Sequence, residues 1–311
     1  MNLITKPDTS ARRIAAVGMY DGVHTGHRFL IDYMGVEARS RGLRPTAVTF
    51  TRHPLTLIRP LEAPGLLGSL ETRVRQLGAA GAKDVILLSF NDSMRRLKAA
   101  EFLKMLKDSF AIDALVLGFN NHFGHDSINT LEQYRTIGRE VGVEVIPAPE
   151  YKGPGAPVSS SGIRKLLADG NVLEAGLKLG YTYALRGRVK GGKHLGRTLG
   201  FPTANLEPYD RSSIIPRPGV YAAWVTTPDG KRRESVVNIG FRPTVENGVG
   251  ESKPELTIEA HIIDYTGYIY DEEITVEFID FLRPERRFPS TARLAAQVKE
   301  DIATALKRLH I

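Results

Sequence analysis

The chain has 311 residues, a length that favours two domains over one. It contains no cysteine, which excludes disulfides, thiolate metal sites and cysteine nucleophiles and fits a reducing cytoplasm. The net charge of +7 is spread along the chain, whereas nucleic-acid-binding proteins often concentrate their excess in a stripe or tail. No stretch is long and apolar enough to cross a bilayer, and no signal peptide is recognisable, so we expect a cytoplasmic protein.

The first half alternates two hydrophobic periods, one typical of strands and one of helices. Short apolar runs predict buried strands at 14–20, 45–50, 84–90, 113–119 and 143–148. Helical patterns lie between them, at 26–41, 70–80, 93–109 and 130–141. Asn129 with Glu132 is predicted to cap the last of these helices, and Gly42 to close the first. This alternation predicts an α/β domain with a mainly parallel sheet covered by helices.

The pattern changes near residue 183. A tight Asp229-Gly230 turn between two apolar segments predicts a β-hairpin. Strand patterns typical of antiparallel sheets are found at 219–227, 232–240, 256–265 and 272–282. An amphipathic helix at 290–309 closes the chain. We therefore predict an all-β second domain, a small antiparallel barrel or sandwich with a C-terminal helix. The predicted domains are residues 1–182 and 183–311.

The stretch V-G-M-Y-D-G-V-H-T-G-H lies where the first strand meets the first helix, at residues 17–27. Ligands of open parallel sheets bind beyond the carboxyl ends of the strands. The glycines let the backbone approach a ligand, and the helix start offers unpaired N–H groups to a phosphate. His24 and His27 are spaced to point N–H donors at one anion. The pattern matches neither a dinucleotide cradle, a P-loop nor a zinc site, and the alternative is a glycine turn with two incidental histidines.

This H-x-G-H resembles the signature of the nucleotidylyltransferase superfamily, which class I aminoacyl-tRNA synthetases share. The resemblance implies that the two histidines stabilise charge on ATP phosphates while an acceptor attacks the α-phosphate. The superfamily carries a second phosphate motif at another helix start, and VSSSGIRKLL at 158–167 is the candidate. Its serines can cap a helix and bind phosphate oxygens, and Arg164 can add a bidentate contact. Alone, this stretch is also compatible with an ordinary helix cap.

A longer set of motifs narrows the family. G-M-Y-D-G-V-H-T-G-H, VTFTRHP (48–54), LVLGFNNHFG (115–124) and VSSSGIR resemble the FMN adenylyltransferase module of bacterial bifunctional riboflavin kinase/FAD synthetases. The second half resembles their riboflavin kinase module in LGRTLGFPTANL (195–206), PGVYAAW (218–224), VVNIGFRPTV (236–245), LTIEAHIID (256–264) and FIDFLRPERRF (278–288). The resemblance implies a Rossmann-like nucleotidyltransferase domain followed by a riboflavin kinase-like barrel. It also implies that riboflavin and ATP yield FMN, and that FMN and a second ATP yield FAD and pyrophosphate.

In the first domain the resemblance makes His24, His27 and Arg164 catalytic. It assigns ATP contacts to Gly18, Met19, Tyr20, Asp21, Asn120, Ser159, Ser160 and Ser161. The chain departs from the family pattern at several positions. Tyr20 replaces a more common Phe, Thr51-Arg52 replace Asp-Pro, Asn120 replaces Asp and His122 replaces Arg. The change at Tyr20 is mild, whereas the loss of fixed charge at Asn120 and His122 is expected to affect how the first domain binds the flavin phosphate or ATP. We expect activity to be retained because both phosphate motifs are present.

In the second domain GFPTANL places Thr203 and Asn205 on one face of an extended segment. Their oxygens suit Mg²⁺ held jointly with ATP phosphates, and the resemblance adds Pro202 to this ATP site. Lys193 and Gly196 belong to a glycine-rich segment that either covers the nucleotide or forms a plain solvated hairpin.

Residues 256–263 alternate, with Ile258, Ala260 and Ile262 on one face and Thr257, Glu259 and His261 on the other. A surface strand has the same pattern. The resemblance makes Glu259 the general base that takes the proton from the 5′-hydroxyl of riboflavin, with flavin contacts from Glu259 and Arg286. Arg286 is alternatively only a solvated charge.

The expected small molecules are riboflavin, FMN and ATP with Mg²⁺, with FMN and FAD as products and with no nucleic acid, membrane or obligate protein partner. One rival hypothesis is a cytidylyl- or adenylyltransferase for another phosphorylated acceptor, with a barrel that only binds. A second is an RNA-binding protein, although no synthetase-type Lys-Met-Ser-Lys-Ser loop and no aromatic and basic stripe are found. A third is a flavin sensor or store, which would not need two ATP-type phosphate sites. Oligomeric state and coupling between the sites are left open.

Overall fold

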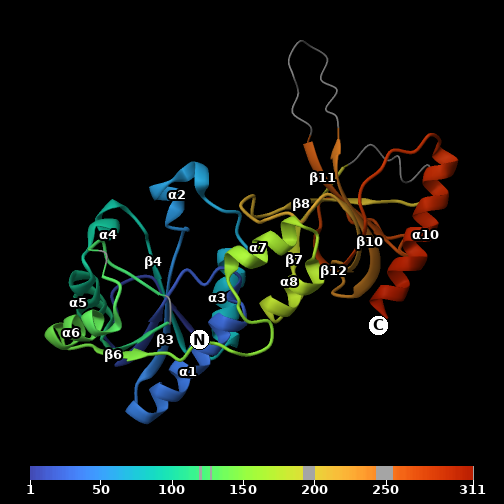
Figure 1. Cartoon of the computed structure of the whole chain (residues 1–311). Helices are drawn as coiled ribbons and strands as arrows, with labels where there is room; N and C mark the ends of the chain where they lie inside the picture. Colours follow the sequence, from blue (N-terminus) through green and yellow to red (C-terminus); the bar gives the residue numbers. More distant parts are fainter. Residues whose placement is uncertain (119–120, 127, 192–199, 243–254, 311) are drawn as a thin grey trace. The chain divides into compact units, whose positions relative to one another are not determined.

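The computed structural model describes residues 1–118, 121–126, 128–191, 200–242 and 255–310 (Figure 1). The chain divides into two compact units, Met1–Ser160 and Ser161–Ile311. This division lies earlier than the predicted boundary at 182/183 because the helices between them belong with the second unit. The backbone N–H of Arg217 donates to the Leu167 carbonyl at 3.0 Å, and the second of these helices contacts the last barrel strand. As a division between two activities, 182/183 stays a prediction.

The first unit contains a six-stranded parallel sheet in the order β1-β4-β3-β2-β5-β6, which confirms the predicted α/β class. Its strands are β1 (Asn2–Ile4), β2 (Arg13–Val17), β3 (Arg44–Phe50), β4 (Asp84–Leu88), β5 (Ile112–Leu117) and β6 (Glu144–Pro147). Its helices are η1 (Asp21–Val23), α1 (Thr25–Arg41), α2 (Leu55–Ile58), η2 (Pro60–Glu62), α3 (Leu70–Ala79), α4 (Asp92–Arg96), α5 (Ala99–Phe110) and α6 (Leu131–Val141). Alternate residues of β2 face opposite cores, one shared with α1 and α3 and the other with α5.

Two local predictions for this unit are wrong in detail. The helix expected at 93–109 is two helices, because Lys98 has extended backbone (φ −69°, ψ 162°) and Glu101 caps a new start by accepting from its N–H. The box that caps α6 is Thr130 with Gln133, one residue later than the predicted pair. Gly42 closes α1 in the left-handed conformation, as predicted.

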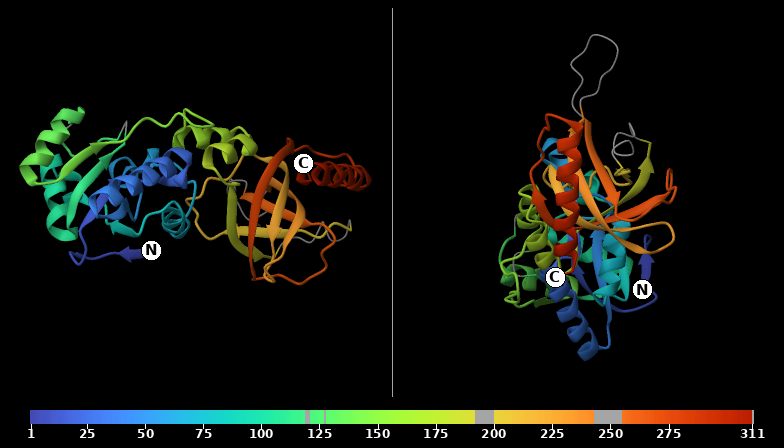
Figure 2. Two further views of the ribbon diagram at one scale, coloured as in Figure 1. Left: turned by 90° about the horizontal axis from the view of Figure 1, so that it is seen from below. Right: turned by 90° about the vertical axis from the view of Figure 1, so that its right-hand side faces the viewer.

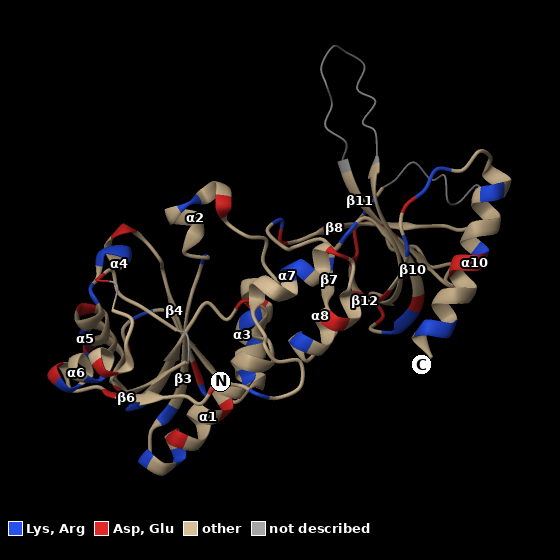
Figure 3. Ribbon diagram, viewed as in Figure 1, with Lys and Arg blue, Asp and Glu red and all other residues tan. Residues whose placement is uncertain are grey.

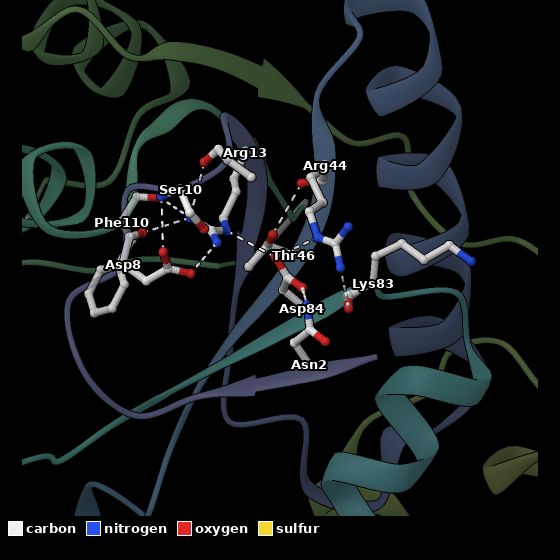
Figure 4. Close-up of polar contacts among 10 residues, drawn as sticks. Asn2, Asp8, Ser10, Arg13, Arg44, Thr46, Lys83, Asp84 and Phe110 are labelled. Carbon is white, nitrogen blue, oxygen red and sulfur yellow. Dashed lines mark hydrogen bonds and ion pairs between the residues drawn. The ribbon is translucent and has the colours of Figure 1, made fainter.

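The amino edge of the sheet is held by a buried charge cluster (Figure 4). The Asp84 carboxylate accepts from Arg13 Nε at 3.0 Å, from Arg44 Nε at 2.7 Å and from Asn2 Nδ2 at 3.1 Å. Arg13 also donates to the Asp8 carboxylate at 2.6 Å. Four segments distant in sequence thus meet where β1, β2, β3 and β4 begin. Because this edge is opposite the carboxyl ends of the strands, the cluster stabilises the sheet and lies away from the expected ligand site.

Replacing Asp84 by Asn is expected to lower the free energy of unfolding of the first unit by about 3 kcal/mol, because the buried Arg13 guanidinium loses its buried carboxylate and keeps only the more exposed Asp8. Urea denaturation followed by circular dichroism measures the change. The single tryptophan, Trp224, lies in the second unit, so its fluorescence transition is an internal control that should not move. Glu144→Gln removes a surface pair with Arg41 and should cost less than about 1 kcal/mol. Equal effects of the two variants would contradict the prediction.

The second unit is a closed antiparallel barrel in the order β10-β11-β8-β7-β12-β9. Its elements are α7 (Ser160–Ala168, starting one residue before the unit), α8 (Val172–Leu179), β7 (Ala184–Lys190), β8 (Ala204–Pro208), β9 (Gly219–Thr226), β10 (Arg232–Arg242), β11 (Glu255–Ile262), β12 (Glu273–Arg283) and α10 (Thr291–Leu309). The predicted hairpin joins β9 and β10, with Gly230 at φ 75°. The helix α10 runs along the barrel (Figure 2) and buries Ala305 against Val220 and Val236. The predicted barrel and C-terminal helix are therefore confirmed.

Basic and acidic side chains are interspersed along the helices of both units (Figure 3). Several exposed pairs join opposite charges one helical turn apart, such as Lys104 with Asp108. The described residues therefore show mixed, solvated faces, as the spread of charge along the sequence predicts.

Candidate active sites

The first candidate site lies at the carboxyl end of β2, in the loop that leads into α1. Tyr20 has left-handed backbone (φ 52°, ψ 33°), and Gly22 follows with φ 78°, a conformation that glycine adopts without steric cost. These turns fold residues 18–23 back before α1 begins at Thr25. The local geometry thus places both predicted histidines at a helix start, beside the edge of the sheet where ligands of such folds bind.

The two histidines lie against each other. Their rings are stacked, with centroids 3.6 Å apart and planes inclined by 14°. His24 Nδ1 accepts from the backbone N–H of His27 at 3.3 Å and so caps α1. This bond leaves the proton of a neutral His24 ring on Nε2, where it is available as a donor. The Tyr20 ring meets the His27 ring edge to face at 5.2 Å.

Both imidazoles are held in the neutral state. Burial lowers the pKa of His24 to about 4, although a backbone hydrogen bond partly opposes it. Burial, and secondarily the neighbouring His24, lowers the pKa of His27 well below its usual value. Near neutral pH the pair therefore offers N–H donors without carrying charge of its own.

The stability of the first unit is expected to fall as the pH drops from 6.5 toward 4. In the unfolded chain His24 is protonated near pH 6.5, whereas in the folded chain it stays neutral until about pH 4. The free energy of unfolding is therefore highest above pH 6.5 and decreases as the pH falls toward 4. At about pH 4.5 the loss amounts to about 2 kcal/mol. Urea denaturation at neutral and acidic pH measures it. His24→Asn keeps a helix cap and should weaken the pH dependence, whereas the exposed His125→Asn should not; an unchanged dependence in His24→Asn would contradict the assignment.

The second phosphate motif begins beside the first. Ser160, the first residue of α7, donates its hydroxyl to the Asp21 carbonyl at 3.0 Å. A side-chain carbon added at Gly26 would come within 3.3 Å of Val158. The structure therefore brings the start of the serine motif onto the histidine loop, 139 residues earlier in the chain. Ser159 and Ser161 are exposed at the same helix start, and Arg164 is half-buried on α7 in the second unit.

The other residues predicted to contact ATP differ in how deeply they are buried. Gly18 and Met19 are half-buried, whereas Tyr20 and Asp21 are buried. The Asp21 carboxylate accepts from the backbone N–H of Leu67 at 2.9 Å, which ties the segment before α3 to the loop. Asp21 thus holds the backbone, and its ATP contact stays a prediction. Asn120 lies outside the described residues, and His122 is exposed.

The second candidate site lies on the barrel, where three strands carry polar residues in one row. Glu259 of β11 pairs in register with Asn205 of β8 and with Asn238 of β10. Thr203 Oγ1 lies 3.5 Å from Glu259 Oε2. Ile258, Ala260 and Ile262 are buried on the other face of β11, as predicted. The structure therefore brings the predicted P-T-A-N residues and the predicted base together.

The oxygen atoms of this row suit a hard cation. Asn205 Oδ1 is buried, and no partner for it is found among the described residues. A buried amide oxygen without a hydrogen-bond donor is costly, and a cation would satisfy it. With the Thr203 hydroxyl nearby, the donors present fit Mg²⁺ shared with phosphate oxygens.

A cavity of about 310 Å³ opens beside Thr203 and Asn205. Its far wall is the segment between β11 and β12, which contributes Tyr265, Tyr268 and Tyr270. Its size and its apolar and aromatic lining suit a small planar ligand. Pro202 lines the same cavity, and its carbonyl lies 2.9 Å from His261 Nδ1. Lys193 and Gly196 fall outside the described residues.

Two residues of this site were not singled out from the sequence. Asn238 donates to Glu285 Oε1 at 3.4 Å, and Glu285 lies so close to Gly240 that a side chain at Gly240 would collide with it. Arg286 contacts Gln297 of α10 and stacks on Phe288 at 4.9 Å, and its flavin contact stays a prediction. The motifs VVNIG and FLRPERRF contain both missed residues. Cross-strand register places Asn238 opposite Glu259, and Glu285 is linked to this row through its hydrogen bond with Asn238.

Two family models match the chain. One described as FAD synthetase matches residues 6–162, and one described as riboflavin kinase matches residues 179–309. The first match contains the histidine loop and the serines of the second phosphate motif, and the second contains the barrel with its Thr-Asn-Glu row.

Curated relatives match over nearly the whole chain. A bifunctional riboflavin kinase/FMN adenylyltransferase from Pseudomonas fluorescens is 35% identical, covering 94% of this chain and 91% of the relative. The protein with the same description from Escherichia coli K12 is 33% identical over the same shares, and that from Bacillus subtilis is 30% identical, covering 96% and 93%.

A solved structure from Streptococcus pneumoniae, described as a macrolide-efflux protein, is 29% identical and covers 97% of both chains with a TM-score of 0.85. That description concerns the other protein; the likeness shows that both units of the fold recur together. In the part of the present chain that is described, no helix has both the length and the apolarity to span a membrane.

Proposed function

This chain belongs to the family of bifunctional riboflavin kinase/FMN adenylyltransferases, and we propose that the parallel-sheet unit carries out adenylylation and the barrel carries out phosphorylation. The enzyme phosphorylates riboflavin with ATP to FMN and then joins FMN to AMP from a second ATP, which yields FAD and pyrophosphate. The observation that carries the division is the pair of sites, a stacked histidine pair at a helix start in one unit and a Thr-Asn-Glu row in the other.

In adenylylation, a phosphate oxygen of FMN attacks the α-phosphorus of ATP, and the bond to the β-phosphate oxygen breaks. The chain supplies no nucleophile; it positions the phosphates and stabilises the charge that builds up on them. His24 and His27 donate N–H groups from neutral rings to the phosphate oxygens. The second motif holds the same phosphates through Ser159, Ser160, Ser161 and Arg164. Gly18, Met19, Tyr20, Asp21 and Asn120 complete the proposed ATP contacts.

In phosphorylation, Glu259 accepts the proton of the riboflavin 5′-hydroxyl while that oxygen attacks the γ-phosphorus of ATP and ADP leaves. Thr203 and Asn205 hold Mg²⁺, which neutralises phosphate charge when bound. The adenine ring occupies the cavity walled by Tyr265, Tyr268 and Tyr270. Pro202 lines this ATP site, and Lys193 and Gly196 belong to it by resemblance. Glu285, through Asn238, supports the flavin side of the row more directly than Arg286 does.

Incubation with riboflavin, ATP and Mg²⁺, followed by separation of the flavins, tests the proposal. FMN should form first and FAD afterwards, and FAD should form from added FMN. Omission of Mg²⁺ should stop phosphorylation. A preparation that adenylylates FMN but never phosphorylates riboflavin would favour a transferase with a barrel that only binds. We propose a cytoplasmic location, in keeping with the cysteine-free composition.

A further inference from the structure

The carbonyl of Met19, in the histidine loop, accepts hydrogen bonds from two side chains. Arg73 Nη1 donates to it at 2.8 Å, and Thr49 Oγ1 donates to it at 3.1 Å. Thr49 is fully buried and Arg73 is 3% exposed. Two side chains from different elements, β3 and α3, therefore converge on one carbonyl just before Tyr20.

Arg73 also connects this loop to the neighbouring strand. Its Nη2 donates to the Phe50 carbonyl at 3.0 Å, at the end of β3. Its Nη1 also lies 3.2 Å from the Met19 sulfur. The planar guanidinium thus spans two backbone segments at the carboxyl edge of the sheet, which a lysine ammonium on a flexible stem cannot reproduce.

The backbone that follows Met19 is unfavourable without such support. Tyr20 and Val23, neither of them glycine, have φ of 52° and 37°. Such conformations persist where the surroundings determine them, and they cluster at functional sites. The bonds to Met19, with that from Leu67 to Asp21, hold the first half of the turn that sets the position of His24.

We propose that Arg73 and Thr49 are positioning residues for adenylylation: by holding the Met19 carbonyl they fix the turn that aligns His24 and His27 with the triphosphate. This inference rests on the proposed roles of the two histidines. Neither Arg73 nor Thr49 needs to touch ATP. A misplacement of the donors by about 1 Å is enough to lower the rate of a reaction that depends on alignment.

The test compares each positioning residue with a matched control. Thr49→Val is paired with Thr46→Val, an equally buried threonine of β3 whose hydroxyl donates to the Arg44 carbonyl at the other edge of the sheet. Arg73→Lys is paired with Arg75→Lys, an exposed arginine of the same helix. FAD formation from FMN and FMN formation from riboflavin are measured on the full chain, with the melting temperature of each variant.

We expect kcat for FAD formation to fall about tenfold in Thr49→Val and 10- to 100-fold in Arg73→Lys, with KM for FMN little changed. Riboflavin phosphorylation should stay at the wild-type rate in all four variants. Because both side chains act on one carbonyl, the double variant should lose less than the product of the single losses. In Arg73→Ala, added guanidinium ion should restore part of the rate.

Retention of the wild-type rate in Thr49→Val and Arg73→Lys would overturn the inference, as would equal losses in the control variants. If Arg73→Ala loses structure, Thr49→Val and its control Thr46→Val still test the inference, because these changes alter neither charge nor volume appreciably. His27→Ala distinguishes failure of the proposed histidine roles from failure of the positioning roles of Arg73 and Thr49. Slow FAD formation in His27→Ala with normal rates in the positioning variants would refute this inference alone, whereas normal rates in His27→Ala would refute the proposed histidine roles.

Discussion

Replacing His27 by Ala is expected to slow FAD formation from FMN about 100- to 1000-fold, because one preorganised N–H donor to the phosphates is lost. The ring lies against the rings of His24 and Tyr20 at the carboxyl end of the sheet and belongs to no strand, so its removal leaves the strand pairing intact. Formation of FMN from riboflavin should continue at the wild-type rate, since that reaction is assigned to the barrel. Steady-state assays of the two reactions on the same preparation measure both.

His24 requires a different comparison because its ring has two functions. Nδ1 caps α1, and Nε2 is the proposed phosphate donor. His24→Asn keeps a capping acceptor, whereas His24→Ala removes the cap as well. We expect the two variants to lose FAD formation to a similar extent and His24→Ala alone to lose additional stability. Wild-type FAD formation in His27→Ala would contradict the proposed chemistry. Normal FAD formation in His24→Asn would show that His24 only caps α1.

Those parts of the fold that depend on local periodicity could be predicted from the sequence. Buried strands followed by amphipathic helices yield the parallel sheet, and the Asp229-Gly230 turn yields the hairpin. The strand β1 is only three residues long and exists through pairing with β4, so it carries no periodic signal of its own. The break between α4 and α5 depends on the backbone of Lys98, which helical spacing on either side conceals.

In the candidate sites, likewise, residues of local motifs could be predicted and residues placed by packing or register could not. The H-x-G-H motif and the P-T-A-N motif are local, and their residues were found directly. Arg73, Thr49 and Asn238 reach their sites through α3, β3 and β10, so their roles depend on packing and register rather than on spacing. Arg286 and Glu285 are neighbours in sequence, yet their side chains contact different elements. A charged motif in a loop predicts that a site is near but does not determine which residue faces it.

Stacked, neutral histidines at a helix start indicate phosphate chemistry, but they do not specify the acceptor. The barrel resolves this, because its Thr-Asn-Glu row suits transfer of a phosphoryl group to a hydroxyl. In the proposed division, one unit makes the phosphate monoester that the other consumes, so riboflavin and ATP suffice as substrates for both reactions.

Replacing Glu259 by Gln is expected to reduce FMN formation from riboflavin about 100-fold or more, because glutamine keeps the shape of the side chain and cannot accept the proton. FAD formation from added FMN should stay at the wild-type rate. With riboflavin as the only flavin, the variant should therefore accumulate neither product. Separation of flavins from parallel reactions started with riboflavin and with FMN measures the two steps independently.

Glu273→Gln is the matched control, because Glu273 lies on another strand of the same barrel, β12, in an exposed pair with Arg186. It removes a carboxylate of the same size and should leave both rates unchanged. Loss of both reactions in Glu259→Gln would mean that the site in the barrel also serves adenylylation, and the division of labour would be wrong. Retention of more than about a tenth of the FMN-forming rate would show that Glu259 is not the base and that alignment of ATP and hydroxyl carries the reaction instead.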